Sequence, residues 1–514
     1  MYNLRNKRNQ GITLIALVIT IIVLLILAAI SITMLTGDNS LLNRAGEAKN
    51  RTELSSLKEE AQMVMLNRVT EKKTSGSNEK TLKEDLENGI SNAIVESINT
   101  TEESEGLTDV YYVSKNGQYV TVYEDGDIEE GKVEIWDGKK VSSPEFKKEN
   151  NVWNWYIYTP SQLKFLADFV NNGNKFDGRD DLKKLVEDAK YDTSTVTMTT
   201  DTTIYLMNNL DLGSRQIDGQ LTSGTSWTPI GMDFNNISGK LGTFEGNDYC
   251  IRGVYVKTNT NFNGIFGNSN TIQRLTIKDS YIEGATYTGG ITGALFSGKI
   301  EKCNNKNTII KSSSKCVGGI AGFSQGTISY CSNNGSIEAS GTGDAQVGGI
   351  VGYEWTDNSD MSINNCVNNG IVKGKGSNVG GIIGFVTTTQ NDLEIINCTN
   401  SGMIIGEADS VGGIVGNSIN IKNVSNCNNS GNVIGGDYVG GITGITTRAS
   451  NCNNKGTIIG KRYVGGITGY VNYITNCNNS GTITGKNDVD GIAGYIANSA
   501  TNCKDNGKVN IVNE

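Results

Sequence analysis

A short glycine motif recurs along the C-terminal part of the chain and limits the folds that are open to it. Nine copies of Gly-Ile-x-Gly occur at intervals of 25 to 32 residues; their first glycines are at positions 264, 290, 319, 349, 381, 413, 441, 466 and 491. Such a period is typical of solenoids, propellers and repeat arrays. A unit of ~25 residues carries two or three strands of about four residues, enough for one coil of a β-helix but not for a propeller blade. We therefore predict a mainly β chain with a parallel β-helix (β-solenoid) over residues 204–514.

The second half of each unit follows the pattern Cys-x-Asn-x-Gly-x-[Ile/Val]. Glycine and asparagine tolerate left-handed backbone, so the pattern predicts a sharp corner at this glycine. The unit after Cys303 has Asn307 in place of the glycine, which agrees with a backbone requirement. The cysteines share one repeat position, so they form either a packed apolar column or disulfides between coils; they are Cys303, Cys331, Cys366, Cys398, Cys427, Cys452, Cys477 and Cys503.

Composition excludes several classes of function. The chain has no histidine, which removes imidazole as a general base and as a metal ligand. The net charge of -9 offers no basic surface for phosphates, so we expect no nucleic-acid partner. The variable repeat positions carry mostly Asn, Ser, Thr and Gly rather than converging carboxylates. We therefore expect no catalytic residues, no cofactor and no metal site.

The N-terminus combines a short basic leader with a long apolar segment. Arg5, Lys7 and Arg8 precede residues 12–36, which contain no charged side chain. About 20 apolar residues suffice to span a bilayer as a helix, and the basic residues would keep the leader in the cytoplasm. A secretory signal cleaved at Ala29-Ile30-Ser31 is the alternative, although the apolar run is longer than the ~7 to 15 residues usual for such signals.

The residues Gly11-Ile12-Thr13-Leu14-Ile15 at this junction resemble the class III leader of type IV prepilins and pseudopilins. The resemblance implies that a prepilin peptidase removes residues 1–11 by cutting between Gly11 and Ile12. It also implies methylation of the new N-terminus, a transmembrane and assembly helix over 12–36, and pilus or secretion assembly proteins as partners. The family's glutamate at the fifth mature residue is replaced by Ala16, which favours a minor or anchored subunit over a filament-building one.

Smaller elements are predicted between the apolar segment and the repeat. Residues 37–70 have the spacing of an amphipathic helix that continues the first one. Residues 71–150, with turns at Asn116-Gly117 and Asp125-Gly126, indicate hairpins and a small α+β, pilin-like region. Residues 151–203 form a helical lead-in, in which Thr159-Pro160-Ser161-Gln162 has the arrangement of a capping box.

The Gly-Gly-Ile-x-Gly units resemble the GLUG motif of bacterial surface proteins and adhesins, and Trp227-Thr228-Pro229-Ile230-Gly231 resembles the opening coils of such arrays. The resemblance implies a cell-surface protein, anchored in the cytoplasmic membrane by its N-terminal helix, with most of the chain extracellular. As an adhesin or minor pilin, it would bind an extracellular glycan or protein. Two alternatives remain: a polysaccharide-active β-helix enzyme and a ligand-free structural spacer.

Loops that project from a rigid solenoid are frequent binding sites. The residues inserted before Cys366 therefore make Trp355, Asp357 and Asp360 the candidate ligand surface. A series of aromatic residues after the glycine motif forms either a sugar-stacking strip or a stacked structural column; its members are Phe323, Tyr353, Phe385, Tyr470 and Tyr495.

Overall fold

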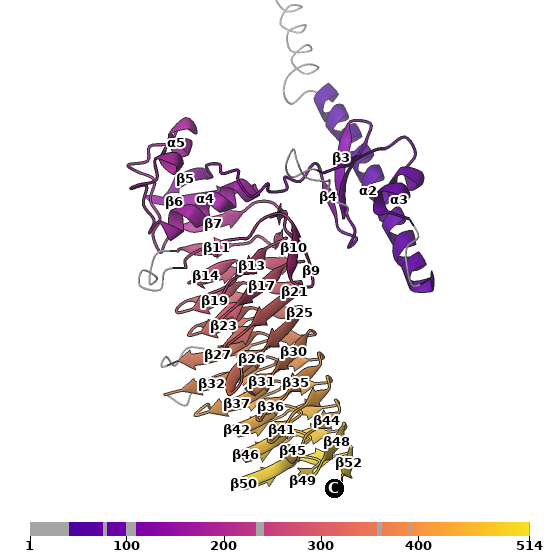
Figure 1. Cartoon of the computed structure of the whole chain (residues 1–514), viewed down its shortest axis with the longest axis vertical. Helices are drawn as coiled ribbons and strands as arrows, with labels where there is room; N and C mark the ends of the chain where they lie inside the picture. Colours follow the sequence, from indigo (N-terminus) through magenta and orange to yellow (C-terminus); the bar gives the residue numbers. More distant parts are fainter. Residues whose placement is uncertain are drawn as a thin grey trace, which may run out of the picture. The chain divides into compact units, whose positions relative to one another are not determined.

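The computed structural model describes residues 41–75, 80–98, 109–232, 241–356, 362–389 and 393–512. The chain divides into two compact units, residues 1–133 and residues 134–514 (Figure 1). The predicted leader over 1–11, with Gly11, and the predicted membrane helix over 12–36, with Ile12 and Ala16, lie outside the described residues. Within the described ranges, no helix has both the length and the hydropathy needed to cross a membrane.

The first unit is a small α+β fold in which one long helix packs on a four-stranded antiparallel sheet. The sheet has the order β1-β2-β3-β4, and the core contains Leu57, Ala61 and Val64 of the long helix α2. Left-handed backbone at Asn116 and Gly117 forms the predicted turn between β2 and β3. The elements are α2 (Leu41–Ser75), α3 (Leu82–Gly89), β1 (Ile94–Ser97), β2 (Val110–Lys115), β3 (Gln118–Tyr123) and β4 (Ile128–Glu130).

A buried arginine joins three parts of the first unit. Arg68 on α2 is 7% exposed and donates hydrogen bonds to Asp85 of α3 at 2.5 Å and to Glu124, after β3, at 2.7 Å. It also donates to the backbone oxygen of Lys80 at 2.9 Å. These bonds join the two helices to the end of β3. Loss of Arg68 would leave the carboxylates of Asp85 and Glu124 without their partner, so we expect the contact between the helices and the sheet to depend on it.

The second unit opens with a hairpin and two helices that cap the first coil. The hairpin is β5 (Glu145–Glu149) and β6 (Val152–Ile157), and the helices are α4 (Pro160–Asn171) and α5 (Asp180–Asp188). Thr159 and Gln162 make the predicted capping box at the start of α4. Strand β5 pairs with β6, and β6 pairs in parallel with β7 (Thr203–Leu206). The second unit begins at Glu134, so the chain divides earlier than the boundary expected at residue 150.

The solenoid makes about nine turns over residues 243–511, and its strands form three parallel sheets (Figure 1). This confirms the predicted mainly β solenoid. We call the sheets sheet 1, sheet 2 and sheet 3. Sheet 1 carries two strands per coil in most coils and one long strand in the last three; after β5 and β6 its members are β7 (Thr203–Leu206), β11 (Thr243–Glu245), β14 (Phe266–Ser269), β15 (Thr271–Gln273), β19 (Thr292–Leu295), β20 (Lys299–Glu301), β23 (Ala321–Ser324), β24 (Thr327–Ser329), β27 (Val351–Thr356), β28 (Ser362–Asn364), β32 (Ile383–Thr388), β33 (Glu394–Ile396), β37 (Val415–Ile419), β38 (Asn423–Ser425), β42 (Thr443–Ser450), β46 (Thr468–Thr475) and β50 (Ala493–Thr501).

The strands of sheet 2 follow the repeat cysteines in the chain. The strands of sheet 3 contain the residue pairs, most of them Val-Gly, that precede the glycine motifs from Gly290 onward. The members of sheet 2 are β8 (Leu210–Asp211), β12 (Cys250–Arg252), β13 (Tyr255–Lys257), β16 (Thr276–Lys278), β17 (Tyr281–Gly284), β21 (Asn304–Ser312), β25 (Ser332–Ala339), β29 (Val367–Asn368), β30 (Ile371–Gly374), β34 (Thr399–Asn400), β35 (Ile404–Gly406), β39 (Asn428–Asn429), β40 (Val433–Ile434), β43 (Asn453–Asn454), β44 (Ile458–Ile459), β47 (Asn478–Asn479), β48 (Thr482–Gly485), β51 (Lys504–Asp505) and β52 (Lys508–Ile511). The members of sheet 3 are β18 (Thr288–Gly289), β22 (Val317–Gly318), β26 (Asp344–Gly348), β31 (Ser377–Gly380), β36 (Val411–Gly412), β41 (Val439–Gly440), β45 (Arg462–Gly465) and β49 (Asn487–Asp490). A separate hairpin pairs β9 (Arg215–Ile217) with β10 (Gln220–Ser223).

Equivalent residues of successive units lie side by side, because the strands pair in parallel and in register. Thr443 pairs with Thr468 in sheet 1, Asn454 with Asn479 in sheet 2, and Val439 with Val464 in sheet 3. A residue type that recurs in the sequence therefore becomes a column along the solenoid, in which the same kind of side chain stacks in coil after coil.

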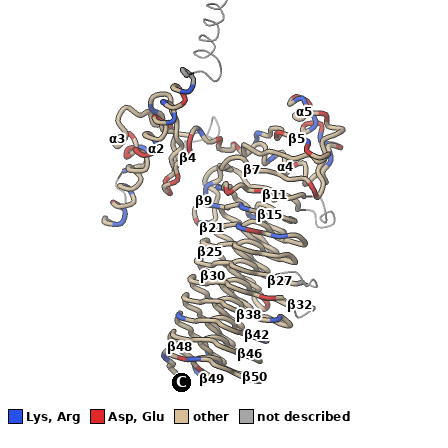
Figure 2. The backbone as a smooth tube through the Cα atoms, turned by 180° about the vertical axis from the view of Figure 1, so that it is seen from behind, with Lys and Arg blue, Asp and Glu red and all other residues tan. Residues whose placement is uncertain are grey.

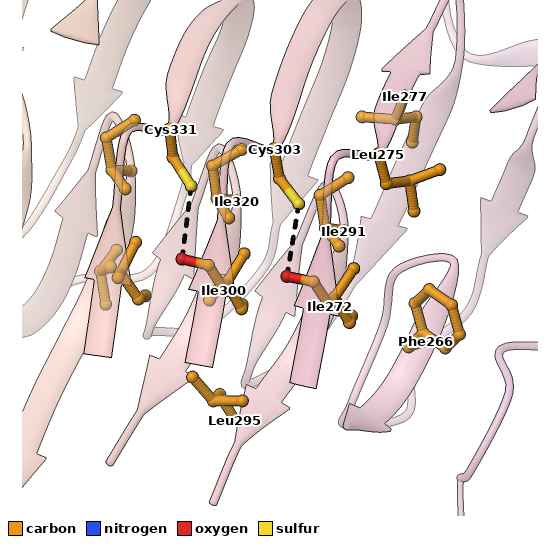
Figure 3. Close-up of a cluster of buried hydrophobic side chains, with 14 of the residues drawn as sticks. Phe266, Ile272, Leu275, Ile277, Ile291, Leu295, Ile300, Cys303, Ile320 and Cys331 are labelled. Carbon is orange, nitrogen blue, oxygen red and sulfur yellow. Dashed lines mark hydrogen bonds between the residues drawn. The ribbon is translucent and has the colours of Figure 1, made fainter. Parts of the chain in front are cut away.

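The repeat cysteines form one such column inside the solenoid. They are free thiols, and all but Cys503 are buried. Figure 3 shows Cys303 and Cys331 among isoleucines, with their thiols directed at the carbonyl oxygens of Ile272 and Ile300, each at 3.7 Å. Of the two alternatives left by the sequence, the structure contains the packed column and not the disulfides.

The glycine of the Cys-x-Asn-x-Gly pattern has a different role from the predicted left-handed corner. Gly370, Gly402 and their equivalents have no positive φ. A Cβ atom added to Gly402 would overlap the carbonyl oxygen of Gly370, the equivalent glycine one coil earlier. Asn307 does have positive φ (51°), but as an additional residue, because the pairing register shifts between Lys306 and Ile309. The prediction of a left-handed corner at this glycine was therefore wrong. Glycine is required there because neighbouring coils approach each other too closely for a Cβ atom.

The left-handed corner lies instead at the residue before each repeat cysteine. These residues have φ between 53° and 57°, and asparagine is the commonest of them; they are Lys302, Tyr330, Asn365, Asn397, Asn426, Asn451, Asn476 and Asn502. Asparagine adopts this conformation more readily than other residues with a side chain. The corner turns the chain from sheet 1 into sheet 2.

A buried asparagine ladder runs along sheet 2 from β21 to β51. In each coil, Nδ2 of the asparagine two residues after the cysteine donates to Oδ1 of the equivalent residue in the next coil at 2.7 to 2.9 Å. The members are Asn305, Asn333, Asn368, Asn400, Asn429, Asn454, Asn479 and, at the end, Asp505. The ladder lies between two apolar clusters, and its continuous hydrogen bonds offset the free-energy cost of burying these amide groups.

Candidate ligand surface on sheet 1

The outer face of sheet 1 carries the aromatic column noted in the sequence. Phe323, Tyr353 and Phe385 follow one another in successive coils, and each pair of ring centroids is 5.5 Å apart. The column is interrupted by Asn417 and resumes later, where Tyr470 and Tyr495 stack at 5.3 Å. Because each ring packs against the ring of the next coil, stacked for Tyr353 with Phe385 and tilted for Phe323 with Tyr353, the column is a structural one.

The predicted ligand residues are only partly described. Trp355 lies in β27, two residues after Tyr353, so both side chains point to the same outer face. It pairs with Thr387 of the next coil and is half-buried. Asp357 and Asp360 lie outside the described residues.

A polar hollow opens on the same face, further along the solenoid. Its volume is 230 Å³, and it lies where β33 and β38 meet the long strands β42 and β46. We call it the sheet 1 hollow; it is lined by Glu394, Lys422, Asn423, Arg448, Ala449, Ser450, Tyr473 and Thr475. The lining residues come from four successive coils, which only the parallel register brings together.

The polar side chains of the hollow are held by one another. Lys422 pairs with Glu394 at 3.2 Å. Asn423 donates from Nδ2 to the hydroxyl of Ser450 at 2.7 Å. Both contacts join neighbouring coils, so they fix the shape of the wall.

Arg448 and Tyr473 form the exposed part of the hollow. The guanidinium carbon of Arg448 lies 5.0 Å from the centre of the Tyr473 ring, and this ring is 41% exposed. Among the described residues, Arg448 makes no ion pair with a carboxylate. The hollow therefore has a net positive charge of about one, with an aromatic ring beside it.

A second unusual group, Glu354, is inside the coil rather than on its surface. Its side chain is fully buried beside Ser324 and Val386, and neither carboxylate oxygen has a hydrogen-bond partner among the described residues. Burial raises the pKa of the Glu354 carboxyl well above its usual range, because the apolar interior disfavours the charged form of this group. It belongs to the core and not to the ligand surface.

The hollow residues were missed at the level of the sequence, although a signal was present. Glu394, Asn423, Arg448 and Tyr473 each stand four residues before a repeat cysteine. Most other units have Ser, Thr or Lys there. Comparing that one position across the units would have shown that a charge and an aromatic ring become neighbours.

Fold and surface together define a β-solenoid protein with a helical cap and a polar hollow on one sheet. No family model matches the sequence, and no curated protein matches it. Among solved structures, a crystal structure from Bacteroides ovatus with the name "putative immunoglobulin A1 protease" is similar at a TM-score of 0.31 and 16% identity, over 69% of this chain and 78% of that chain. A similarity at this level carries no conclusion about activity.

Proposed function

We propose that the protein is a cell-surface adhesin whose solenoid binds a glycan on the outer face of sheet 1. The observation that carries the proposal is the sheet 1 hollow, where the exposed Tyr473 ring adjoins hydroxyl, amide and charged groups. Carbohydrate sites combine an aromatic surface with a few fixed polar groups. The parallel strands supply a rigid support, which keeps the cost of ordering the site low.

The N-terminal residues support display outside the cytoplasmic membrane. Cleavage by a prepilin peptidase between Gly11 and Ile12 would leave the apolar segment over 12–36 as the anchor. Ala16 favours a minor or anchored subunit over a filament-building one. Intact mass of the membrane-extracted protein tests this: a methylated chain that starts at Ile12 supports the proposal, and a chain that starts near Ile32 refutes it.

Binding is favoured over glycan hydrolysis by the composition of the hollow. Glycoside hydrolysis commonly uses two carboxylates on either side of the scissile bond. The residues that line the hollow include a single carboxylate, Glu394, and it pairs with Lys422. We therefore propose a binding protein and not an enzyme.

A glycan array with the detergent-extracted full-length protein tests the function. We expect retention of a restricted set of oligosaccharides, and a loss of this signal for the variant Tyr473→Ala. The matched control is Tyr438→Ala, because Tyr438 stacks on Tyr463 at 4.8 Å and does not line the hollow. Release of reducing ends from a polymer substrate would refute the binding proposal in favour of an enzyme, and the absence of any bound glycan would favour a spacer.

A further inference from the structure

We propose that the sheet 1 hollow recognises a sugar residue that carries a carboxylate, with the Arg448 guanidinium as the partner of that carboxylate. The inference rests on the proposed glycan-binding function and names the ligand class of the same site. It is carried by three observations: the charge of the hollow, the position of Arg448 over the Tyr473 ring and the size of the space.

The charge of the hollow is local and differs from that of the chain. The protein has a net charge of -9, and Figure 2 shows only scattered positions of charged residues along the coils. Within strands β37, β38, β42, β46 and β50, Arg448 is the single charged residue. Since Lys422 is neutralised by Glu394 at 3.2 Å, the charge that remains available to a ligand is that of Arg448.

The position of Arg448 suits a planar anion. Its guanidinium carbon lies over the Tyr473 ring, 5.0 Å from the ring centre, and this contact holds the side chain on the surface of sheet 1. A guanidinium carries its N–H donors in a planar fork, and this fork matches the two oxygens of a carboxylate. The hydroxyl groups of Ser450 and Thr475, which also line the hollow, are available to sugar hydroxyls.

The size of the hollow suits one sugar residue. Its volume of 230 Å³ is below the ~300 to 1,000 Å³ of sites that enclose drug-sized ligands. A longer glycan would therefore place one acidic residue in the hollow and extend along sheet 1. Sulfated glycans are less suited, because they are bound by clusters of Lys and Arg, whereas Arg448 stands alone.

Another coil provides a matched control. Arg462 of β45 also lies over a tyrosine ring, that of Tyr463, with 5.3 Å between its guanidinium carbon and the ring centre. Arg462, however, is paired with Asp437 at 2.7 Å and lies in sheet 3. The variants Arg448→Ala and Arg462→Ala thus remove the same kind of side chain, one with a free charge and one with a neutralised charge.

The experiment measures the affinity of the full-length protein for three tetrasaccharides that differ only at the terminal residue: uronic acid, its neutral counterpart and its sulfated counterpart. We expect the uronic acid form to bind at least about tenfold more tightly than the neutral form. Arg448→Ala should abolish this preference, Arg448→Lys should retain part of it, and Arg462→Ala should leave it unchanged. Because Arg448 is exposed, circular dichroism should show the same fold in every variant.

The outcomes separate the two proposals. Equal binding of the acidic and neutral forms, or an unchanged preference in Arg448→Ala, overturns the carboxylate inference and leaves glycan binding standing. Tighter binding of the sulfated form also overturns it. Failure of all three tetrasaccharides, together with an empty glycan array, refutes the proposed function itself.

Discussion

The asparagine ladder gives the sharpest test of what holds the coils together. Asn429 is 1% exposed and makes three side-chain hydrogen bonds. It accepts from Asn400 at 2.8 Å, donates to Asn454 at 2.8 Å and donates to the carbonyl oxygen of Gly431 at 2.9 Å. The variant Asn429→Ala removes all three at once and leaves a gap in the column.

The magnitude follows from those bonds. A buried hydrogen bond contributes ~1 kcal/mol net, so the loss of three predicts a local destabilisation of about 3 kcal/mol. Little is added for groups left without partners, because Asn400 still donates to Gly402 and Asn454 still accepts from the Gly456 amide. Asn428→Ala is the matched control: its side chain is exposed and accepts one bond from Asn453, so we expect a loss below about 1 kcal/mol.

Hydrogen exchange followed by mass spectrometry measures the effect coil by coil, because local opening in a solenoid does not require unfolding of the whole array. We expect faster exchange in the peptides that contain β39 and β43 in Asn429→Ala, and near-native exchange in Asn428→Ala. Asn429→Asp adds a check on direction, because it loses the donor. Its exchange, relative to that of the native protein at the same pH, should approach the native rate as the pH falls and the buried carboxyl becomes protonated. Equal effects of the two alanine variants would refute the ladder as a stabilising element.

Three further predictions concern other buried groups. Since burial raises the pKa of Glu354 above that of a glutamate in the unfolded chain, the stability due to this group is present at low pH and is lost as the pH rises from the unfolded pKa toward the raised one. The gain in melting temperature of Glu354→Gln over the native protein should therefore grow from pH 4 to pH 8. Among the eight repeat cysteines, Cys503 alone should react with a thiol reagent in the native protein, as peptide mass spectrometry would show, and early labelling of Cys398 would contradict the packed column. Arg68→Ala should destabilise the first unit by about 3 kcal/mol, read as faster amide exchange in α2 and α3 with no change in the solenoid.

Much of the architecture was predictable because it depends on patterns that repeat or on local chemistry. The interval of the Gly-Ile-x-Gly motif predicted the coil, and the parallel register confirms it. The capping box at Thr159 and the turn at Asn116 were also predicted correctly, since each is decided by a few neighbouring residues.

The candidate site was much less accessible to prediction. Loop insertions pointed to Trp355, which is on the outer face of sheet 1 but does not line the hollow. The hollow combines side chains that are about one repeat apart in sequence and adjacent in space, such as Arg448 and Tyr473. Motif reading within one unit does not find such a site, because no single unit contains it.

The sequence by itself determined that this chain coils. A repeated Val-Gly-Gly-Ile unit must adopt the same backbone each time, and it buries its isoleucine only against its neighbours. Tertiary structure decided what each repeated residue does. It showed that the glycines at Gly370 and Gly402 are required by the contact between coils and not by their own φ, and that the asparagines form one ladder. The physical reason is that stacking in register turns each position of the repeat into a column of contacts between coils. The residues of a single repeat do not determine these contacts, because they depend on the neighbouring coil.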